Sequence, residues 1–325
     1  MKNKDIPNQI VLCEEFLNQK VKYFFTTKEK SIFLTNIEKN NDPVPEGIPV
    51  ILRLSSSNST AISKTVSLRL TEEEIGKAIW KIFLSIQSKA SIRLKTNPVD
   101  LRIADVKLEK EEDGRVSIQQ TIVSKHTYMN FPQNPLTVQN IHANLSSQVT
   151  QPLVFISNNK TSICLNGSQV KKINWGFLNI EKAFEKELNL NKQGFDQLIK
   201  RYKKNSLSKS MQLLTKKILI SSQTELLEKL NNFFEKKEEK NVIYYSRKYQ
   251  ELITFGNKLK SKVRYQEFIQ EKALKKFSFT LQLTKELEDN IPLDTRLAIL
   301  SYLEYQTNSK INKIVQRQLR WLNNK

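Results

Sequence analysis

The chain has 325 residues and carries 53 Lys and Arg against 33 Asp and Glu, which gives a formal charge of +20 and a pI of about 9.7. Its 38% hydrophobic and 26% charged residues are typical of a globular protein, and its length predicts about two domains. Only 7 glycines are present, and the absence of G-x-G-x-x-G, G-x-x-x-x-G-K-[ST] and G-x-S-x-G excludes the common dinucleotide, P-loop and esterase signatures.

Proline and charge both divide the chain into two parts. Eight of the nine prolines lie between Pro7 and Pro152. Residues 1–174 hold 23 basic and 16 acidic side chains (net +7), whereas residues 175–325 hold 30 and 17 (net +13). We therefore predict an α+β protein with a β-rich domain over residues 1–174 and a basic, mainly helical domain over residues 175–325.

The first part reads mostly as strands, because aromatic and β-branched residues are concentrated in short runs. These runs are residues 19–34, 50–54 and 65–70. A β-hairpin is predicted from residues 101–108 and 116–123, which flank the polar turn at residues 111–114.

One helix is predicted in this part, from Thr71 to about Ala90. Thr71 and Glu74 form a capping box at its start. Apolar side chains then recur on one face, at Ile75, Ile79, Ile82, Phe83 and Ile86. We expect this helix to pack on the sheet.

The second part reads mainly as helices. Ser222 and Glu225 form another capping box, before a stripe that begins at Leu226. A preceding helix is predicted to bury the stripe Leu207, Met211, Leu214 and Ile218. Residues 277–283 alternate apolar and polar side chains, which indicates either the wing of a winged helix or a strand added to the N-terminal sheet.

Residues 180–204 predict two helices joined by a tight turn. Phe184 and Leu188 lie on the apolar face of the first helix, Asn191 is a good N-cap, and Phe195 and Leu198 lie on the apolar face of the second. The segment resembles the helix-turn-helix motif of many DNA-binding proteins, which places its second helix in the major groove. Asn189, where that family often has Gly, and Gly194, which weakens the start of the second helix, depart from the pattern.

The resemblance implies that polar residues of the second helix contact bases and phosphates. The candidate nucleic-acid-binding residues there are Lys192, Gln193, Gln197, Lys200, Arg201, Lys203 and Lys204. A second candidate is a basic amphipathic helix over residues 309–322, which carries Lys310, Lys313, Arg317 and Arg320 on one face. Either basic stripe is also compatible with a solvated helix face.

Catalytic patterns are weak. Asp100, Asp105 and Lys107 resemble the acidic and lysine positions of PD-(D/E)-x-K nucleases, but four residues between the two carboxylates are too few for the usual strand crossing. Two cysteines, Cys13 and Cys164, and two histidines are too few for a disulfide framework or a four-cysteine zinc site. We therefore expect no enzyme activity and no cofactor.

These observations favour a soluble intracellular protein that binds DNA or RNA without catalysis. No run approaches about 18 uninterrupted apolar residues, so neither a transmembrane helix nor a membrane partner is expected. Phosphate neutralisation by Lys and Arg is the expected source of affinity. The alternative is a structural or scaffold subunit of a larger assembly, such as a ribonucleoprotein, in which helix faces dock other proteins.

Overall fold

The computed structural model describes residues 7–16, 19–40, 42–55, 58–110, 113–129, 136–165, 168–247, 250–255, 262–269, 273–283, 291–306, 314–315 and 317–319. The chain forms two compact units. The first unit comprises Met1–Gln148, Asn166–Gln169 and Ile269–Lys325, and the second comprises Val149–Leu165 and Val170–Phe268. The prediction divided the chain after residue 174, whereas here the chain enters the second unit at Val149, contributes Asn166–Gln169 to the first unit, and returns to the first unit at Ile269.

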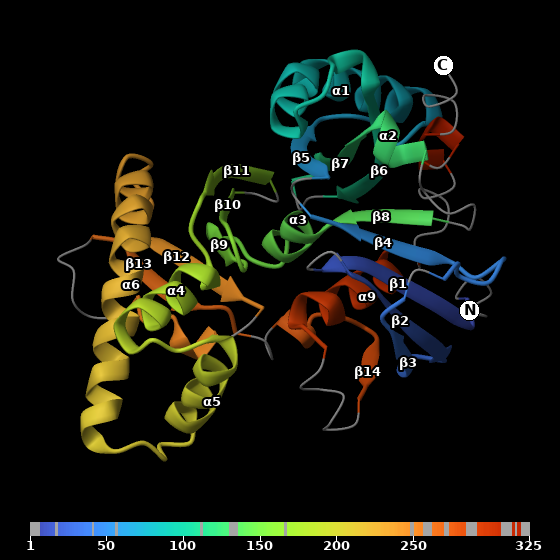
Figure 1. The fold of residues 1–325 in the computed structure, drawn as a ribbon. Coiled ribbons are helices and arrows are strands. Elements are labelled where there is room, and N and C mark those ends of the chain that lie inside the picture. The colour runs from blue at the N-terminus through green and yellow to red at the C-terminus, as the bar shows by residue number, and fades with distance from the viewer. Residues whose placement is uncertain are drawn as a thin grey trace. The chain divides into compact units, whose positions relative to one another are not determined.

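A six-stranded mixed sheet forms the larger layer of the first unit (Figure 1). Its order is β14-β3-β2-β1-β4-β8. β1, β2 and β3 are an antiparallel meander, whereas β4 pairs parallel with β1, β8 with β4 and β14 with β3. The strands are β1 (Gln9–Phe16), β2 (Gln19–Lys28), β3 (Ser31–Glu38), β4 (Val50–Leu54), β8 (Leu136–Asn140) and β14 (Thr280–Gln282).

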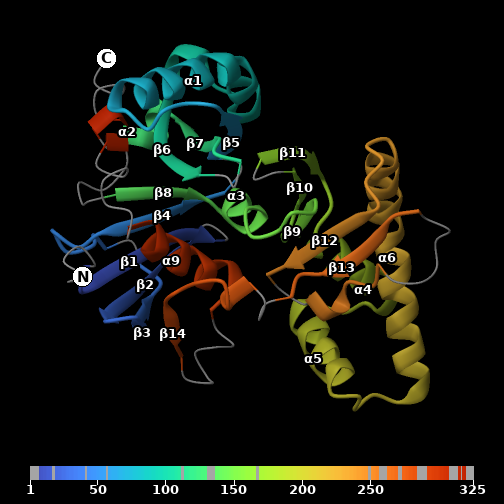
Figure 2. The same cartoon turned by 180° about the vertical axis from the view of Figure 1, so that it is seen from behind.

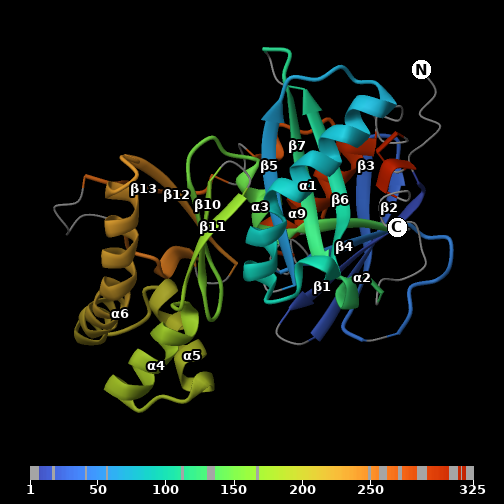
Figure 3. The same cartoon turned by 90° about the horizontal axis from the view of Figure 1, so that it is seen from above.

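A three-stranded antiparallel sheet, in the order β5-β7-β6, lies under a long helix in the same unit (Figure 3). The elements are β5 (Ser59–Val66), α1 (Glu72–Leu94), β6 (Leu101–Lys110) and β7 (Val116–Ser124). Thr71 accepts a hydrogen bond from the backbone N–H of Glu74 at 3.3 Å, and Ile75, Ile79 and Ile86 are buried against the sheet. The predicted helix, its capping residue and the β6–β7 hairpin are confirmed.

Helix α9 (Leu293–Gln306) lies against the six-stranded sheet (Figures 1 and 2). Every residue from Leu293 to Leu300 is buried, including Asp294 and Thr295. The fully buried Arg53 of β4 donates to the carboxylates of Glu14 and Asp294, both at 2.8 Å, and to the Thr295 hydroxyl at 3.0 Å. Three elements far apart in the sequence are thereby joined through one guanidinium group.

The second unit contains a five-stranded sheet in the order β11-β10-β9-β12-β13. β9 pairs antiparallel with β10 and parallel with β12. Its strands are β9 (Leu153–Ile156), β10 (Thr161–Leu165), β11 (Ser168–Ile173), β12 (Asn241–Ser246) and β13 (Arg264–Glu267), and its helices are α4 (Phe177–Leu188), α5 (Lys192–Lys203) and α6 (Lys209–Glu235). Short helices complete the described elements: η1 (Pro98–Asp100), α2 (Lys125–Met129), α3 (Ile141–Ser146) and η2 (Gln250–Leu252).

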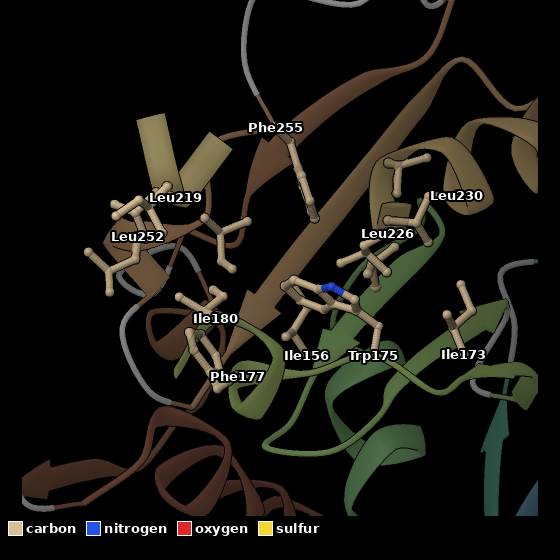
Figure 4. Close-up of a cluster of buried hydrophobic side chains, with 14 of the residues drawn as sticks. Ile156, Ile173, Trp175, Phe177, Ile180, Leu219, Leu226, Leu230, Leu252 and Phe255 are labelled. Carbon is tan, nitrogen blue, oxygen red and sulfur yellow. The ribbon is translucent and has the colours of Figure 1, made fainter. Parts of the chain in front are cut away.

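Trp175 lies in the apolar core of this unit, at 1% exposure. Figure 4 shows its indole ring among Ile156, Ile180 and Leu226, which come from β9, α4 and α6. Its Nε1 donates to the carbonyl of Ser222 in α6 at 3.1 Å. The next residue must be Gly176, because a Cβ there would lie 2.4 Å from the carbonyl oxygens of Ser157 and Asn158. These carbonyls accept hydrogen bonds from the backbone N–H groups of Phe177 and Leu178, at the start of α4. The close packing of Gly176 against residues 157–158 therefore positions that helix.

The predicted fold class is wrong in its C-terminal half. Residues 175–325 are not a mainly helical domain, because they supply β12 and β13 to the sheet of the second unit and β14 to the sheet of the first. The alternating segment at residues 277–283 contains β14, an added strand and not a wing. The capping box at Ser222 is also wrong, because this residue lies inside α6, whose N-cap is Ser208.

Candidate functional site

The sequence places its strongest candidate on α4 and α5, and the structure forms both helices. Asn189, at φ 53°, ends α4 in the left-handed conformation, and the Asn191 side chain caps α5 by accepting from the N–H of Gly194 at 2.8 Å. The predicted turn and N-cap are therefore confirmed. Gly194 sits at the third position of α5, where the cap offsets its low helix propensity.

The inner faces of these helices pack into the core of the second unit. The rings of Phe184 and Phe195 meet edge to face with centroids 5.2 Å apart, and Leu198 and Ile199 are buried beside them. All the apolar residues predicted to face inward on α5 thus take part in packing. Its polar residues are left on the opposite face.

The outer face of α5 and the turn after it form a basic surface. Its predicted members are all exposed: Lys192, Gln193, Gln197, Lys200, Arg201, Lys203 and Lys204. Asp196 is the only acidic residue among residues 188–224, which contain eight basic residues. The local potential is therefore positive, which attracts anionic groups at low ionic strength.

Exposed basic residues also occur on the first half of α6, where sequence reasoning missed them. Lys209, Lys216 and Lys217 are exposed, and between them Leu213 is 69% and Leu214 38% exposed. Leu214 was predicted to belong to a buried stripe, which is wrong, whereas Ile218 of the same stripe is buried. The signal available in the sequence was the scarcity of acidic residues over residues 188–224.

The second predicted basic stripe lies partly outside the described residues, which exclude Lys310, Lys313 and Arg320. Val315 and Leu319 are buried against α1. Arg317 is exposed, and its guanidinium lies 3.7 Å from the carboxylate of Glu72 at the start of α1. An exposed pair of this kind contributes about 0–1 kcal/mol to stability. The apolar residues Val315 and Leu319 therefore account for the packing of this segment, and Arg317, the one described member of the basic stripe, remains exposed.

The residues that resemble nuclease positions do not assemble into a metal site. Asp100 ends η1, and Asp105 follows on β6 with its carboxylate buried and accepting from the N–H of Val106 at 2.9 Å. The Lys107 ammonium donates to the hydroxyl of Ser301 in α9 at 3.2 Å. No group of three or more Cys, His, Asp or Glu side chains with metal-binding geometry occurs within the described ranges.

Burial raises the pKa of Asp105 from 3.8 to about 7, although the nearby Lys107 ammonium and the Val106 amide lower it. Between these values the folded chain holds a proton on Asp105 that the unfolded chain has released, so the contribution of Asp105 to the stability of the first unit falls as pH rises from about 4 to about 7. Asp105→Asn removes this decline. The difference between the urea unfolding midpoints at about pH 5 and about pH 8, determined for the parent chain and for Asp105→Asn, measures the decline. The control is exposed Asp113→Asn, and a decline that persists in Asp105→Asn contradicts the prediction.

Comparisons with known proteins establish the fold but not a family. No protein-family model matches the chain, and no curated protein matches its sequence. A structure described as the PilM-PilN type IV pilus biogenesis complex matches with a TM-score of 0.54 and 9% identity, over 91% of this chain and 98% of that chain. The chain therefore shares the fold of a chain in that structure.

Two further structures match with lower scores. The cytoplasmic domain of EpsL, described as an inner membrane component of the type II secretion system of Vibrio cholerae, gives a TM-score of 0.37 at 8% identity, over 88% of this chain and 97% of that chain. A Bacteroides thetaiotaomicron protein of unknown function, described as having an actin-like ATPase fold, gives 0.28 at 9% identity, over 57% and 78%. Neither score is high enough to indicate a common fold.

The predicted nucleic-acid-binding function, with DNA or RNA as partner and a helix-turn-helix as the motif, is wrong. It rested on a separate, mainly helical basic domain, whereas α4 and α5 are packed on a five-stranded sheet in a fold shared with a pilus biogenesis structure. That structure is described as a pilus biogenesis complex and not as a nucleic-acid-binding protein.

Among the described residues, no helix combines the length and apolar character needed to cross a membrane.

Proposed function

We propose that the chain is a non-catalytic, protein-binding component of a multi-protein assembly. The observation that carries the proposal is the shared fold with the pilus biogenesis structure, which extends over 98% of that chain. That structure is of a complex between two proteins, and only the general role of binding a protein partner is transferred to this chain.

The surface chemistry of the second unit supports a binding role. Large apolar side chains exposed among charged ones are a feature of protein interfaces, whose centres are apolar and whose rims are polar. Leu213 and Leu214, which lie between exposed lysines on α6, have this arrangement. The buried Gln223 of the same helix donates a hydrogen bond to the Leu252 carbonyl at 2.7 Å and accepts one from the N–H of Thr254 at 2.9 Å. These bonds fix the inner face of α6 to the segment at residues 252–254.

The test is native purification of the full chain from its own cells after mild chemical cross-linking, with quantification of the co-purifying proteins and nucleic acid. We expect at least one protein at fixed stoichiometry, and we expect the complex to survive nuclease treatment. Reconstitution from the purified components, measured by calorimetry, is the second step. Recovery of the chain alone, or with a polynucleotide whose removal dissolves the complex, contradicts the proposal.

A further inference from the structure

Leu213 is the most exposed large apolar side chain of α6, at 69%. On a helix, residues three and four positions apart are neighbours, so Leu213 has Lys209 and Lys217 along its row and Lys216 beside it. Leu214, at 38% exposure, widens the apolar area, and Lys217 lies three positions after it. We call these five residues the leucine–lysine patch.

The lysines of the patch have no acidic partner within the described part of the chain. No described carboxylate lies within ion-pair distance of Lys209, Lys216 or Lys217, whereas Lys229, further along the same helix, pairs with Glu225. The basic face of α5 adds Lys192, Lys200 and Arg201 to the same unit. The carboxylates of a partner protein can therefore pair with these lysines without displacing a described carboxylate of this chain.

We propose that the leucine–lysine patch binds an acidic amphipathic segment of a partner protein. One apolar side chain of that segment packs on Leu213 and Leu214, and its flanking carboxylates pair with Lys209, Lys216 and Lys217. The inference rests on the proposed function, because it names the chemistry of the partner. Docking of this kind uses apolar anchors for affinity and peripheral charge pairs for orientation and association rate.

The patch is less suited to a membrane surface. Helices that lie in a bilayer interface bury a broad apolar face, usually with aromatic residues. On α5 the apolar side chains Phe195, Leu198 and Ile199 are committed to the core, and on α6 so are Ile218, Leu226 and Leu230. Two leucines remain, which is enough to anchor a peptide but little for insertion into lipid.

The experiment places a photo-cross-linking amino acid at position 213 of the full chain, expressed in its own cells, and maps the cross-linked peptide by mass spectrometry. We expect a protein segment with apolar residues and an excess of Asp and Glu. The mapped segment is then synthesised with a fluorescent label, and its binding to the purified full chain is measured by anisotropy at several salt concentrations. Phosphatidylglycerol vesicles and a labelled single-stranded oligonucleotide are tested in parallel.

Matched variants separate the contributions of apolar contact and charge. We expect Leu213→Ser to weaken peptide binding by about thirtyfold, as for a central anchor, and the double variant Lys216→Glu/Lys217→Glu by about tenfold at low salt. The charge control is Lys236→Glu/Lys237→Glu, which makes the same change in net charge at the exposed C-terminal end of α6. The apolar control is Leu84→Ser on α1, at 50% exposure. Both controls are expected to stay within about twofold of the parent chain.

The inference is overturned if no protein segment cross-links to position 213, or if the mapped segment lacks an acidic excess. It is also overturned if the patch variants bind the peptide as tightly as their controls do. A further contrary result is that Leu213→Ser weakens binding to vesicles or to the oligonucleotide but not to the peptide. A partner that co-purifies but cross-links elsewhere overturns this inference and leaves the proposed function standing. Circular dichroism confirms that each variant is folded, as expected for exposed positions.

Discussion

Arg53→Met is expected to lower the free energy of unfolding of the first unit by about 3–5 kcal/mol. The substitution keeps an apolar chain of similar length but leaves the buried carboxylates of Glu14 and Asp294 without the guanidinium that lies 2.8 Å from each. Two like charges then face a low-dielectric interior without their shared cation. Because Glu14 is on β1 and Asp294 on α9, the loss loosens the attachment of α9 to the sheet.

The measurement is native-state hydrogen exchange of peptides from β1, β4 and α9, supported by urea unfolding. The matched control is the triple variant Glu14→Leu/Arg53→Met/Asp294→Leu, which removes all the charges together. Buried ion pairs replaced as a set by apolar residues are often close to neutral, so this variant should recover most of the loss. A single Arg53→Met variant as stable as the parent chain would contradict the expected role of the network.

Trp175→Ala is expected to destabilise the second unit by about 3–5 kcal/mol, the usual range for deletion of a buried Trp or Phe. The indole fills the space among β9, α4 and α6, and its Nε1 bonds to the Ser222 carbonyl (Figure 4). The variant leaves a cavity and an unsatisfied carbonyl on α6. The expected outcome is faster hydrogen exchange in α6 and β12.

Two controls make this prediction specific. Trp175→Phe retains most of the buried ring but loses the 3.1 Å hydrogen bond, so we expect a loss of about 1–2 kcal/mol. Trp80→Ala, on α1 and 43% exposed, is the same deletion at a half-exposed site in the first unit. It should cost about 1 kcal/mol, because little surface is buried there. Equal losses of stability for Trp80→Ala and Trp175→Ala would show that the burial of Trp175 does not cause the loss, which would contradict the prediction.

Local interactions account for the elements that the sequence predicts well. Thr71 with Glu74 sets the start of α1, and Asn189 and Asn191 set the turn between α4 and α5, because caps act within a few residues of the chain. The β6–β7 hairpin pairs residues that are close in sequence around a turn with Gly114 at φ +81°. The excess of basic residues over residues 188–224 likewise follows from the sequence alone and places charge on α5 and α6.

Contacts between distant segments decided the rest. The parallel pairs β1–β4, β9–β12 and β3–β14 join strands whose partners no local pattern specifies. The same is true of Arg53 and Asp294, which are 241 residues apart in the chain. Which apolar residues of a helix are buried also depends on its neighbours, so the stripe that included Leu214 did not reveal that this side chain is exposed beside Leu213. The sequence by itself determined the caps of α1 and α5, the hairpin and the basic charge. The tertiary structure decided the sheets, the units and the leucine–lysine patch, because these depend on packing between segments that are distant along the chain.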